Sequence, residues 1–319
     1  MRRGYIHDTI HHLQFLSQAL AAGEASLFVH YVAWVRMLRR QRNLSTEILI
    51  VTLQCVATVL QRHVSSRGGS PWLPYIDAGL ARLNQPAASE PDLVDSHPLS
   101  QLKKMYLDVV LRGKRRDASK LIMAALDAGA DVRDIYLHVF QGAQYDIGQL
   151  WYMNEITTAQ EHYCTAVTQS IISQLYPRIF SAQRNGRALV ATCAFGERHE
   201  IGVRMVSDFF EMDGWDTYYL GTNTSAKRVV RELADRKAEL LLVSVTMASH
   251  LAMAKRLITL VRSSNVCRGV MILVGGYPFN IATDLWKNIG ADGCGRDAAE
   301  AVAVARTLLE KKSIAAGKL

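Results

Sequence analysis

The chain has 319 residues, 49% of them hydrophobic and 21% charged, which is enough for two or three modest domains with sizeable cores. The formal net charge of +8 comes from scattered Lys and Arg residues, so a solvated basic surface is favoured over a nucleic-acid-binding face. Five cysteines without a C-x-x-C pair argue against a disulfide framework or a zinc site and for a reducing cytoplasm. Neither a signal peptide nor a bilayer-spanning run is visible, so we expect no membrane association.

Residues 1–84 predict an all-helical domain, because apolar residues recur at helical spacing and polar or glycine-containing breaks separate the runs. Ser45 is placed to cap the third helix. The expected helices cover about 6–22, 25–42, a run ending near 64, and 72–83.

Residues 85–98 contain three prolines and no apolar periodicity, which predicts a linker between domains. Four helices of similar length are expected over 99–181, with Asp131 and Thr158 as N-caps. Short loops between such helices favour an antiparallel four-helix bundle.

Residues 187–315 alternate short apolar runs with helical patterns, which predicts a doubly wound parallel sheet of five strands. Ligands of such sheets bind at the carboxyl ends of the strands. The expected strands are 187–193, 216–221, 239–246, 269–276 and 292–295, and the expected helices lie near 201–212, 226–237, 252–263, 280–289 and 298–311.

Three short motifs fall at these carboxyl ends. Each has a plain structural interpretation when taken singly, because loop histidines and glycine turns are common. Together they indicate a ligand, since an imidazole can bind a metal, hydroxyls can satisfy buried polar groups and glycines let a bulky group approach the backbone. The motifs are Glu197-x-His199-x-x-Gly202 after the first strand, Ser244 and Thr246 closing the third, and Gly275-Gly276 closing the fourth.

This set resembles the signature of flavodoxin-like cobalamin-binding domains. The resemblance implies that His199 is the lower axial cobalt ligand and that Glu197 is its proton partner. It also implies that the nucleotide tail of the cofactor enters the sheet beside Ser244 and Thr246, where Gly275 and Gly276 leave room. Glu197 and Thr246 stand where many members of the family have Asp and Leu.

The bundle contains a second motif, in which Trp151 is followed after nine residues by Glu161 and His162. Plain interpretations are core packing for Trp151 and a capping box from Thr158 to Glu161. The W-x9-EH spacing resembles the light-dependent repressors of the CarH/LitR-like family. That resemblance implies adenosylcobalamin, with these three side chains around the adenosyl group above the cobalt.

The N-terminal segment shows no helix-turn-helix pattern, so we expect no direct DNA binding. The arrangement of the whole chain is most similar to the photocobilin sub-family, which implies biliverdin, a linear tetrapyrrole, as a second ligand. An amphipathic helix with a solvated basic face explains the same residues without a ligand. The candidate bilin-binding side chains are His30, Tyr31, Trp34, Arg36, Arg39 and Arg40.

The resemblance implies a cytoplasmic light sensor without enzymatic activity. It would bind adenosylcobalamin through His199 and change its conformation or its homo-oligomeric state when light breaks the cobalt–carbon bond, with a protein partner for its output. Two alternatives stay open: a corrinoid methyl-carrier protein of a methyltransferase system, and a cobalamin-binding antirepressor that acts by protein–protein contact.

Overall fold

The computed structural model describes residues 2–64, 69–85 and 97–316, so most of the predicted linker lies outside the described residues. The chain forms two compact units. The first combines Met1–Leu93 with two segments from the last third, Thr246–Ala252 and Tyr277–Leu285. The second unit holds the remaining residues, including the bundle and the sheet. No helix in the described part of the chain is long and apolar enough to cross a membrane.

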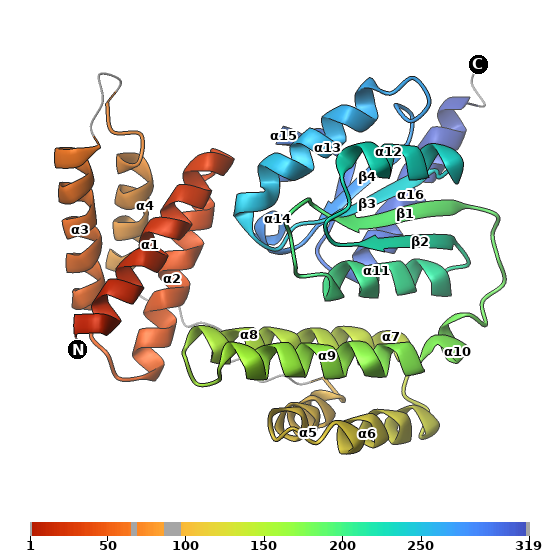
Figure 1. Ribbon diagram of the computed structural model, residues 1–319, viewed down its shortest axis with the longest axis horizontal. Coiled ribbons are helices and arrows are strands. Elements are labelled where there is room, and N and C mark those ends of the chain that lie inside the picture. Colours follow the sequence, from red (N-terminus) through yellow and green to blue (C-terminus); the bar gives the residue numbers. More distant parts are fainter. Residues whose placement is uncertain (1, 65–68, 86–96, 317–319) are drawn as a thin grey trace. The chain divides into compact units, whose positions relative to one another are not determined.

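The first unit is built on four helices, as the apolar spacing predicts (Figure 1). Ser45 caps α3, because its hydroxyl accepts a hydrogen bond from the backbone N–H of Glu47. A Cβ at Gly79 would lie only 3.2 Å from the Phe28 ring, so the glycine lets α4 pack closely on α2. The helices are α1 (Arg2–Ala22), α2 (Ala25–Gln41), α3 (Thr46–His63) and α4 (Leu73–Asn84).

The second unit begins with the predicted four-helix bundle. Asp131 is the N-cap expected from the sequence, and its carboxylate accepts from the backbone N–H of Arg133. The other expected cap is wrong by one residue, because Thr157 rather than Thr158 forms a capping box, with Gln160. Helices of the bundle are α5 (Ser100–Leu111), α6 (Arg115–Asp127), α7 (Val132–Asp134) with π-helix η1 (Ile135–Gln141) and α8 (Gly142–Tyr152), then α9 (Thr158–Gln174) and the short α10 (Tyr176–Ile179).

The sheet has five parallel strands in the order β2-β1-β3-β4-β5, which confirms the predicted fold class. Figure 1 shows α11 and α12 on opposite faces of this sheet, and α16 packs against α11. The strands are β1 (Ala188–Cys193), β2 (Asp216–Gly221), β3 (Leu240–Ser244), β4 (Met271–Gly275) and β5 (Gly293–Gly295). The other elements are α11 (Ile201–Met212), α12 (Ala226–Asp235), 3-10 helix η2 (Ala248–His250), α13 (Leu251–Ser263), α14 (Tyr277–Ile281), α15 (Leu285–Asn288) and α16 (Ala298–Ala316).

The bundle and the sheet domain share one hydrophobic core, which runs from the bundle through α11 to the strands. A buried polar link joins them, because the Tyr136 hydroxyl donates to Asp208 Oδ2 of α11 at 2.8 Å. Burial raises the pKa of Asp208 to about 6. The guanidinium of Arg204 adds a second link, through Ser173 and the Tyr176 hydroxyl. The bundle is therefore held on the α11 side of the sheet.

Candidate functional site

The candidate site lies where the strand order reverses. Strands β1 and β3 are neighbours, while the chain runs from β1 outward to β2 and from β3 outward to β4. This reversal point at the carboxyl ends of the strands is the usual ligand site of a doubly wound sheet. The Glu197–His199 loop follows β1 at this edge.

The Glu197 side chain is fully buried and organises the loop around itself. Its Oε1 accepts from the backbone N–H groups of Arg198, at 2.9 Å, and His199, at 3.2 Å. The same oxygen accepts from Nδ1 of the His199 ring. Because Nδ1 is held in this way, Nε2 is the ring nitrogen left for a ligand. The ring itself stays 55% exposed, so its outer part is accessible.

The electrostatics of the loop favour a proton on His199. Its pKa is raised above the ordinary value of 6.5, first by the hydrogen bond to Glu197, although partial burial acts in the opposite direction. The carboxylate of Glu161, on α9 of the bundle, raises this pKa as well. The fold therefore brings Glu161 into electrostatic range of His199, although 38 positions separate them in the sequence.

Small residues line up across the carboxyl edge of the sheet. The register pairs Ser244 with Cys193 on one side and with Gly275 on the other, and Gly275 pairs with Gly295. Gly276 has φ +108°, and a Cβ there would collide with the carbonyl oxygen of Val245. These glycines are required by the chain itself, and they also leave the edge without side chains that would block a bulky group.

Gly202 differs from the glycines of the sheet edge. It lies in the first turn of α11, it is exposed, and a Cβ at this position would meet nothing within 4 Å. Packing of the chain therefore gives no reason for a glycine here. Close approach of a bound group to the loop would be one reason for it.

The bundle residues of the second motif lie at the surface. Trp151 is 41% exposed and its indole N–H donates to Thr158 Oγ1 at 3.0 Å, so the core-packing interpretation of this tryptophan is wrong. Glu161 does not cap its helix and instead accepts from the Thr165 hydroxyl at 2.9 Å. His162 is exposed beside it, with Nε2 at 3.5 Å from Glu161 Oε2. Surface positions of this kind are available to a ligand or partner.

Sequence reasoning missed one polar group at the site. Glu200, next to His199, accepts from the Tyr219 hydroxyl of β2 at 3.0 Å and from the Gln169 amide of α9 at 3.3 Å. No local sequence pattern predicts these contacts, because the partners of Glu200 come from β2 and from the bundle. Gly295 was also missed, although a glycine at the end of the short fifth strand offered the same signal as Gly275.

The six candidate bilin residues of α2 are mostly engaged in packing within the first unit. Tyr31 is buried, stacks on Phe15 and is hydrogen-bonded to His12, while Arg36 is buried and donates to three carbonyls at the end of α4. His30 is hydrogen-bonded to Tyr277, and Arg39 donates a hydrogen bond to the carbonyl of Ser45. Trp34 lies beside Tyr31, and Arg40 is exposed.

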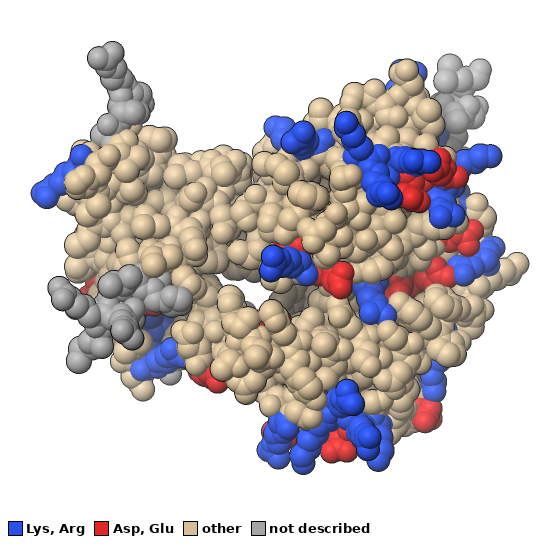
Figure 2. Space-filling model, in the orientation of Figure 1, with Lys and Arg blue, Asp and Glu red and all other residues tan. Residues whose placement is uncertain are grey.

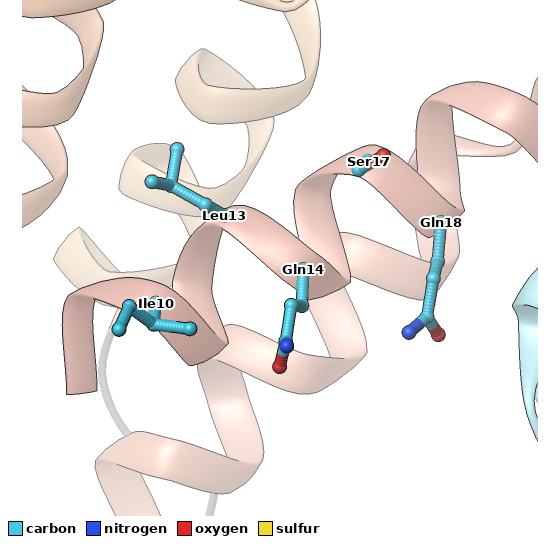
Figure 3. Close-up of a pocket in the computed structure, with 5 residues that line it drawn as sticks. All are labelled: Ile10, Leu13, Gln14, Ser17 and Gln18. Carbon is cyan, nitrogen blue, oxygen red and sulfur yellow. The ribbon is translucent and has the colours of Figure 1, made fainter. Parts of the chain in front are cut away.

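A surface depression in the same unit does not include any of these six residues. It is lined by Ile10, Leu13, Gln14, Ser17 and Gln18, which all come from α1 (Figure 3). Side chains from a single helix do not enclose a chromophore. The depression therefore gives no support to a bilin site.

Comparison with protein families identifies both parts of the second unit. A model described as B12 binding domain matches residues 187–303, and a second model of the same description matches residues 102–176. The N-terminal helices lie outside both matched ranges. The cobalamin-binding part of the sequence interpretation is therefore confirmed.

The chain is similar to corrinoid proteins of Methanosarcina. It is 30% identical over 199 residues to monomethylamine corrinoid protein 1 of Methanosarcina mazei, which covers 60% of this chain and 90% of that protein. It is 26% identical over 215 residues to the dimethylamine corrinoid protein of Methanosarcina barkeri, which covers 66% and 93%. The structure of the Methanosarcina barkeri monomethylamine corrinoid protein has a similar fold, with a TM-score of 0.60, 24% identity, and coverage of 66% of this chain and 99% of that one.

These relatives overturn the photoreceptor interpretation. The assignment to the CarH/LitR-like family and to the photocobilin sub-family is wrong, and with it the light-sensing function and the basis for biliverdin. The W-x9-EH spacing was thus not diagnostic. The chain belongs to the family of B12-binding corrinoid proteins that includes the monomethylamine corrinoid proteins of Methanosarcina.

Proposed function

We propose that this protein is a corrinoid carrier of a methyltransferase system, which presents a methyl group to partner enzymes. The observation that carries the proposal is the 30% identity with monomethylamine corrinoid protein 1 over 90% of that protein. The names of the relatives point to methylated amines as the source of the methyl group. A carrier of this kind has no catalytic residues of its own, because the partners activate donor and acceptor.

His199 is the proposed protein ligand of the cobalt, through Nε2. Glu197 keeps the proton on Nδ1 and fixes the orientation of the ring, which is the usual role of a carboxylate behind a metal-binding histidine. A bound corrinoid supplies a cobalt centre that can accept and release a methyl group. Among the described residues no three His, Cys, Asp or Glu gather to hold a bare metal ion, which suits a metal carried by its own macrocycle.

The edge of the sheet is the proposed site of the cofactor tail. Ser244 ends β3 and Thr246 follows it, and both supply hydroxyls, while Gly275 and Gly276 keep the neighbouring strand end open. Gly202 allows close approach to the first turn of α11. These roles are those implied by the cobalamin-domain signature, and the row of small residues supports them.

The upper side of the cofactor is proposed to meet Trp151, Glu161 and His162. All three are accessible, and the effect of Glu161 on the pKa of His199 supports their closeness to the cofactor site. We propose a methyl group rather than adenosyl as the upper ligand, since a partner enzyme must reach it. Five cysteines that form no disulfide fit a cytoplasmic carrier.

Methyl transfer in a defined mixture tests the function. The full chain is loaded with cobalamin, reduced with a chemical reductant to the Co(I) state, and combined with a methylamine-specific methyltransferase and with monomethylamine or dimethylamine. We expect amine-dependent changes in the corrinoid absorption spectrum, and none in a control without the methyltransferase. A protein that binds adenosylcobalamin, responds to light and accepts no methyl group from either amine would contradict the proposal.

A further inference from the structure

Helix α3 is apolar on two sides, although only one side faces the core of its unit. Leu49, Leu53 and Val56 are buried. Four other residues, at spacings of three, four and four, form a second row that is accessible along the helix. This α3 stripe consists of Ile48 (38% exposed), Val51 (55%), Cys55 (exposed) and Val59 (55%).

The middle of the α3 stripe is bordered by uncharged residues, and the charged residues Glu47 and Arg62 lie at its ends. In Figure 2 the N-terminal helices present a mostly uncharged surface, whereas Lys and Arg gather over the sheet domain and over α5 and α6. Within α3, the neighbours Gln54, Thr58 and Gln61 are polar and uncharged. A continuous apolar row with a polar, neutral rim is typical of a protein interface. A helix that lies on a membrane carries several Lys and Arg along its polar face, whereas α3 has a single one, Arg62, in its last turn.

We propose that the α3 stripe is a self-association surface, on which two copies of the chain pair their α3 helices antiparallel about a two-fold axis at Cys55. Val51 and Val59 each lie four residues from Cys55, so the axis sets Val51 opposite Val59 of the second copy, twice by symmetry. Ile48 lies seven residues before Cys55 and Arg62 seven residues after it. Ile48 therefore packs on the aliphatic stem of Arg62 of the second copy.

Charges at the two ends of α3 select the antiparallel orientation. Glu47, in the first turn, and Arg62, in the last turn, are both exposed. Antiparallel pairing brings Glu47 beside Arg62 of the second copy at both ends of the interface. Parallel pairing would set Glu47 against Glu47 and Arg62 against Arg62, which is unfavourable. The sequence of this face thus complements itself in one orientation.

The size of the α3 stripe sets the expected strength. One helix pair buries less than the ~800 Å² per partner of a standard interface, so the dimer dissociates in the micromolar range, on the order of 1–100 μM. Sedimentation of the full chain over a wide concentration range should show a reversible monomer–dimer equilibrium. Val51→Glu should raise the dissociation constant at least about tenfold, because a carboxylate would be buried beside Val59 of the second copy. Gln54→Glu, an exposed change off the stripe, is the matched control and should have little effect.

Cross-linking reports the register directly. Cys55 is the one cysteine of the five that is exposed, so a short bismaleimide, which adds one thiol to each of its two double bonds, should link two copies through it. Cys55→Ser should abolish this product. In that background, a mixture of Val51→Cys and Val59→Cys chains should cross-link. Val51→Cys chains alone should not, because their thiols lie about 12 Å apart along the helix axis.

A charge exchange tests the orientation. Arg62→Glu should weaken the dimer, and the double variant Glu47→Arg with Arg62→Glu should restore it. Three outcomes would each overturn the proposal: a monomer at every concentration, a dimer that tolerates both Val51→Glu and Val59→Glu, or equal cross-linking of every cysteine pair. All of these changes are on exposed side chains, so folding should survive, and circular dichroism of each variant checks this.

Discussion

The sheet edge and helix α2 both carry residues that look suited to a ligand, but the fold uses them in different ways. At the sheet edge, buried Glu197 serves to hold an accessible imidazole. In α2, Tyr31 and Arg36 are buried and serve to hold helices together. Side chains in a loop beyond a strand are not needed for the core, whereas a helix must bury one face. An aromatic and basic helix is therefore weaker support for a ligand than a polar loop at a strand end.

Two histidines show the same contrast. Burial lowers the pKa of His12 in α1 to about 4, so this ring is neutral and packs with Tyr31. The pKa of His199 is raised, because its partner is a carboxylate rather than a hydroxyl. A metal-binding histidine needs an oriented and accessible ring, which His199 has and His12 lacks.

The largest expected effect is that of Gly276→Ala on the sheet domain. The residue has a positive φ and a Cβ would collide with the Val245 carbonyl, so the backbones of β3 and β4 must separate. We expect a loss of at least about 3 kcal/mol in the free energy of unfolding, measured by urea titration. Gly202→Ala is the control, since a Cβ there meets nothing, and its stability should be unchanged. Equal stability of the two variants would show that the strand ends are not closely packed.

His199→Ala should weaken corrinoid binding about 100-fold, because the proposed cobalt ligand is removed while Glu197 stays buried. Affinity is measured by titration with cobalamin, and the absorption spectrum shows whether an imidazole binds the cobalt. His162→Ala, an exposed change on the bundle, should retain the imidazole-bound spectrum. Wild-type affinity and spectrum in the His199 variant would remove this histidine from the site.

Arg36→Met should destabilise the N-terminal helices without touching corrinoid binding. The guanidinium donates to the carbonyls of Arg82, Leu83 and Gln85, and methionine leaves these acceptors without their donor. The expected loss is about 2 kcal/mol in thermal or urea unfolding. Arg40→Met, an exposed change one helical turn later, should cost little. A change in corrinoid affinity in the Arg36 variant, but not in the Arg40 variant, would contradict the purely structural role of α2.

The smallest expected effect is the pH dependence of corrinoid binding. Cobalt needs an unprotonated Nε2, and the pKa of His199 in the folded protein is raised above 6.5. Binding should therefore strengthen as pH rises toward that pKa and weaken about tenfold per pH unit below it. The contribution of the Glu197–His199 pair to folding of the cofactor-free protein has the opposite sign, since it is present below pH 6.5 and lost as pH rises. Affinities that stay constant from pH 5 to 8 would contradict proton competition at this ring.

The sequence predicted the sheet domain well, because five apolar runs with helical patterns between them leave few alternatives. The run over 216–221 and the helix over 201–212 match β2 and α11 to the residue. The expected helix over 280–289 is wrong, since the chain forms α14 and α15 there with a break between them. Periodicity does not register such a break when apolar residues continue on both sides.

The site was predictable where it depends on local sequence and not where it depends on distant partners. Position in the loop after β1 marked His199 and Glu197. The contacts of Glu200 with Tyr219 and Gln169 depend on strand order and on packing of the bundle, which no single stretch encodes. The family assignment was the least secure prediction. The spacing of Trp151 and Glu161 suggested a light sensor, whereas the relatives are monomethylamine and dimethylamine corrinoid proteins.

The composition of the first unit has a consequence for protein engineering. Two of its segments lie at the strand ends that carry the motifs: Thr246–Ala252 begins at the Thr of Ser-x-Thr, and Tyr277–Leu285 follows Gly-Gly. The second segment is linked to α2 by the hydrogen bond between the Tyr277 hydroxyl and His30 Nδ1, at 3.0 Å. The N-terminal helices are therefore not a detachable appendage. A chimera that joins these helices to another corrinoid protein has to include both segments as well. Otherwise the helices lose the contacts that they make with those segments in this chain.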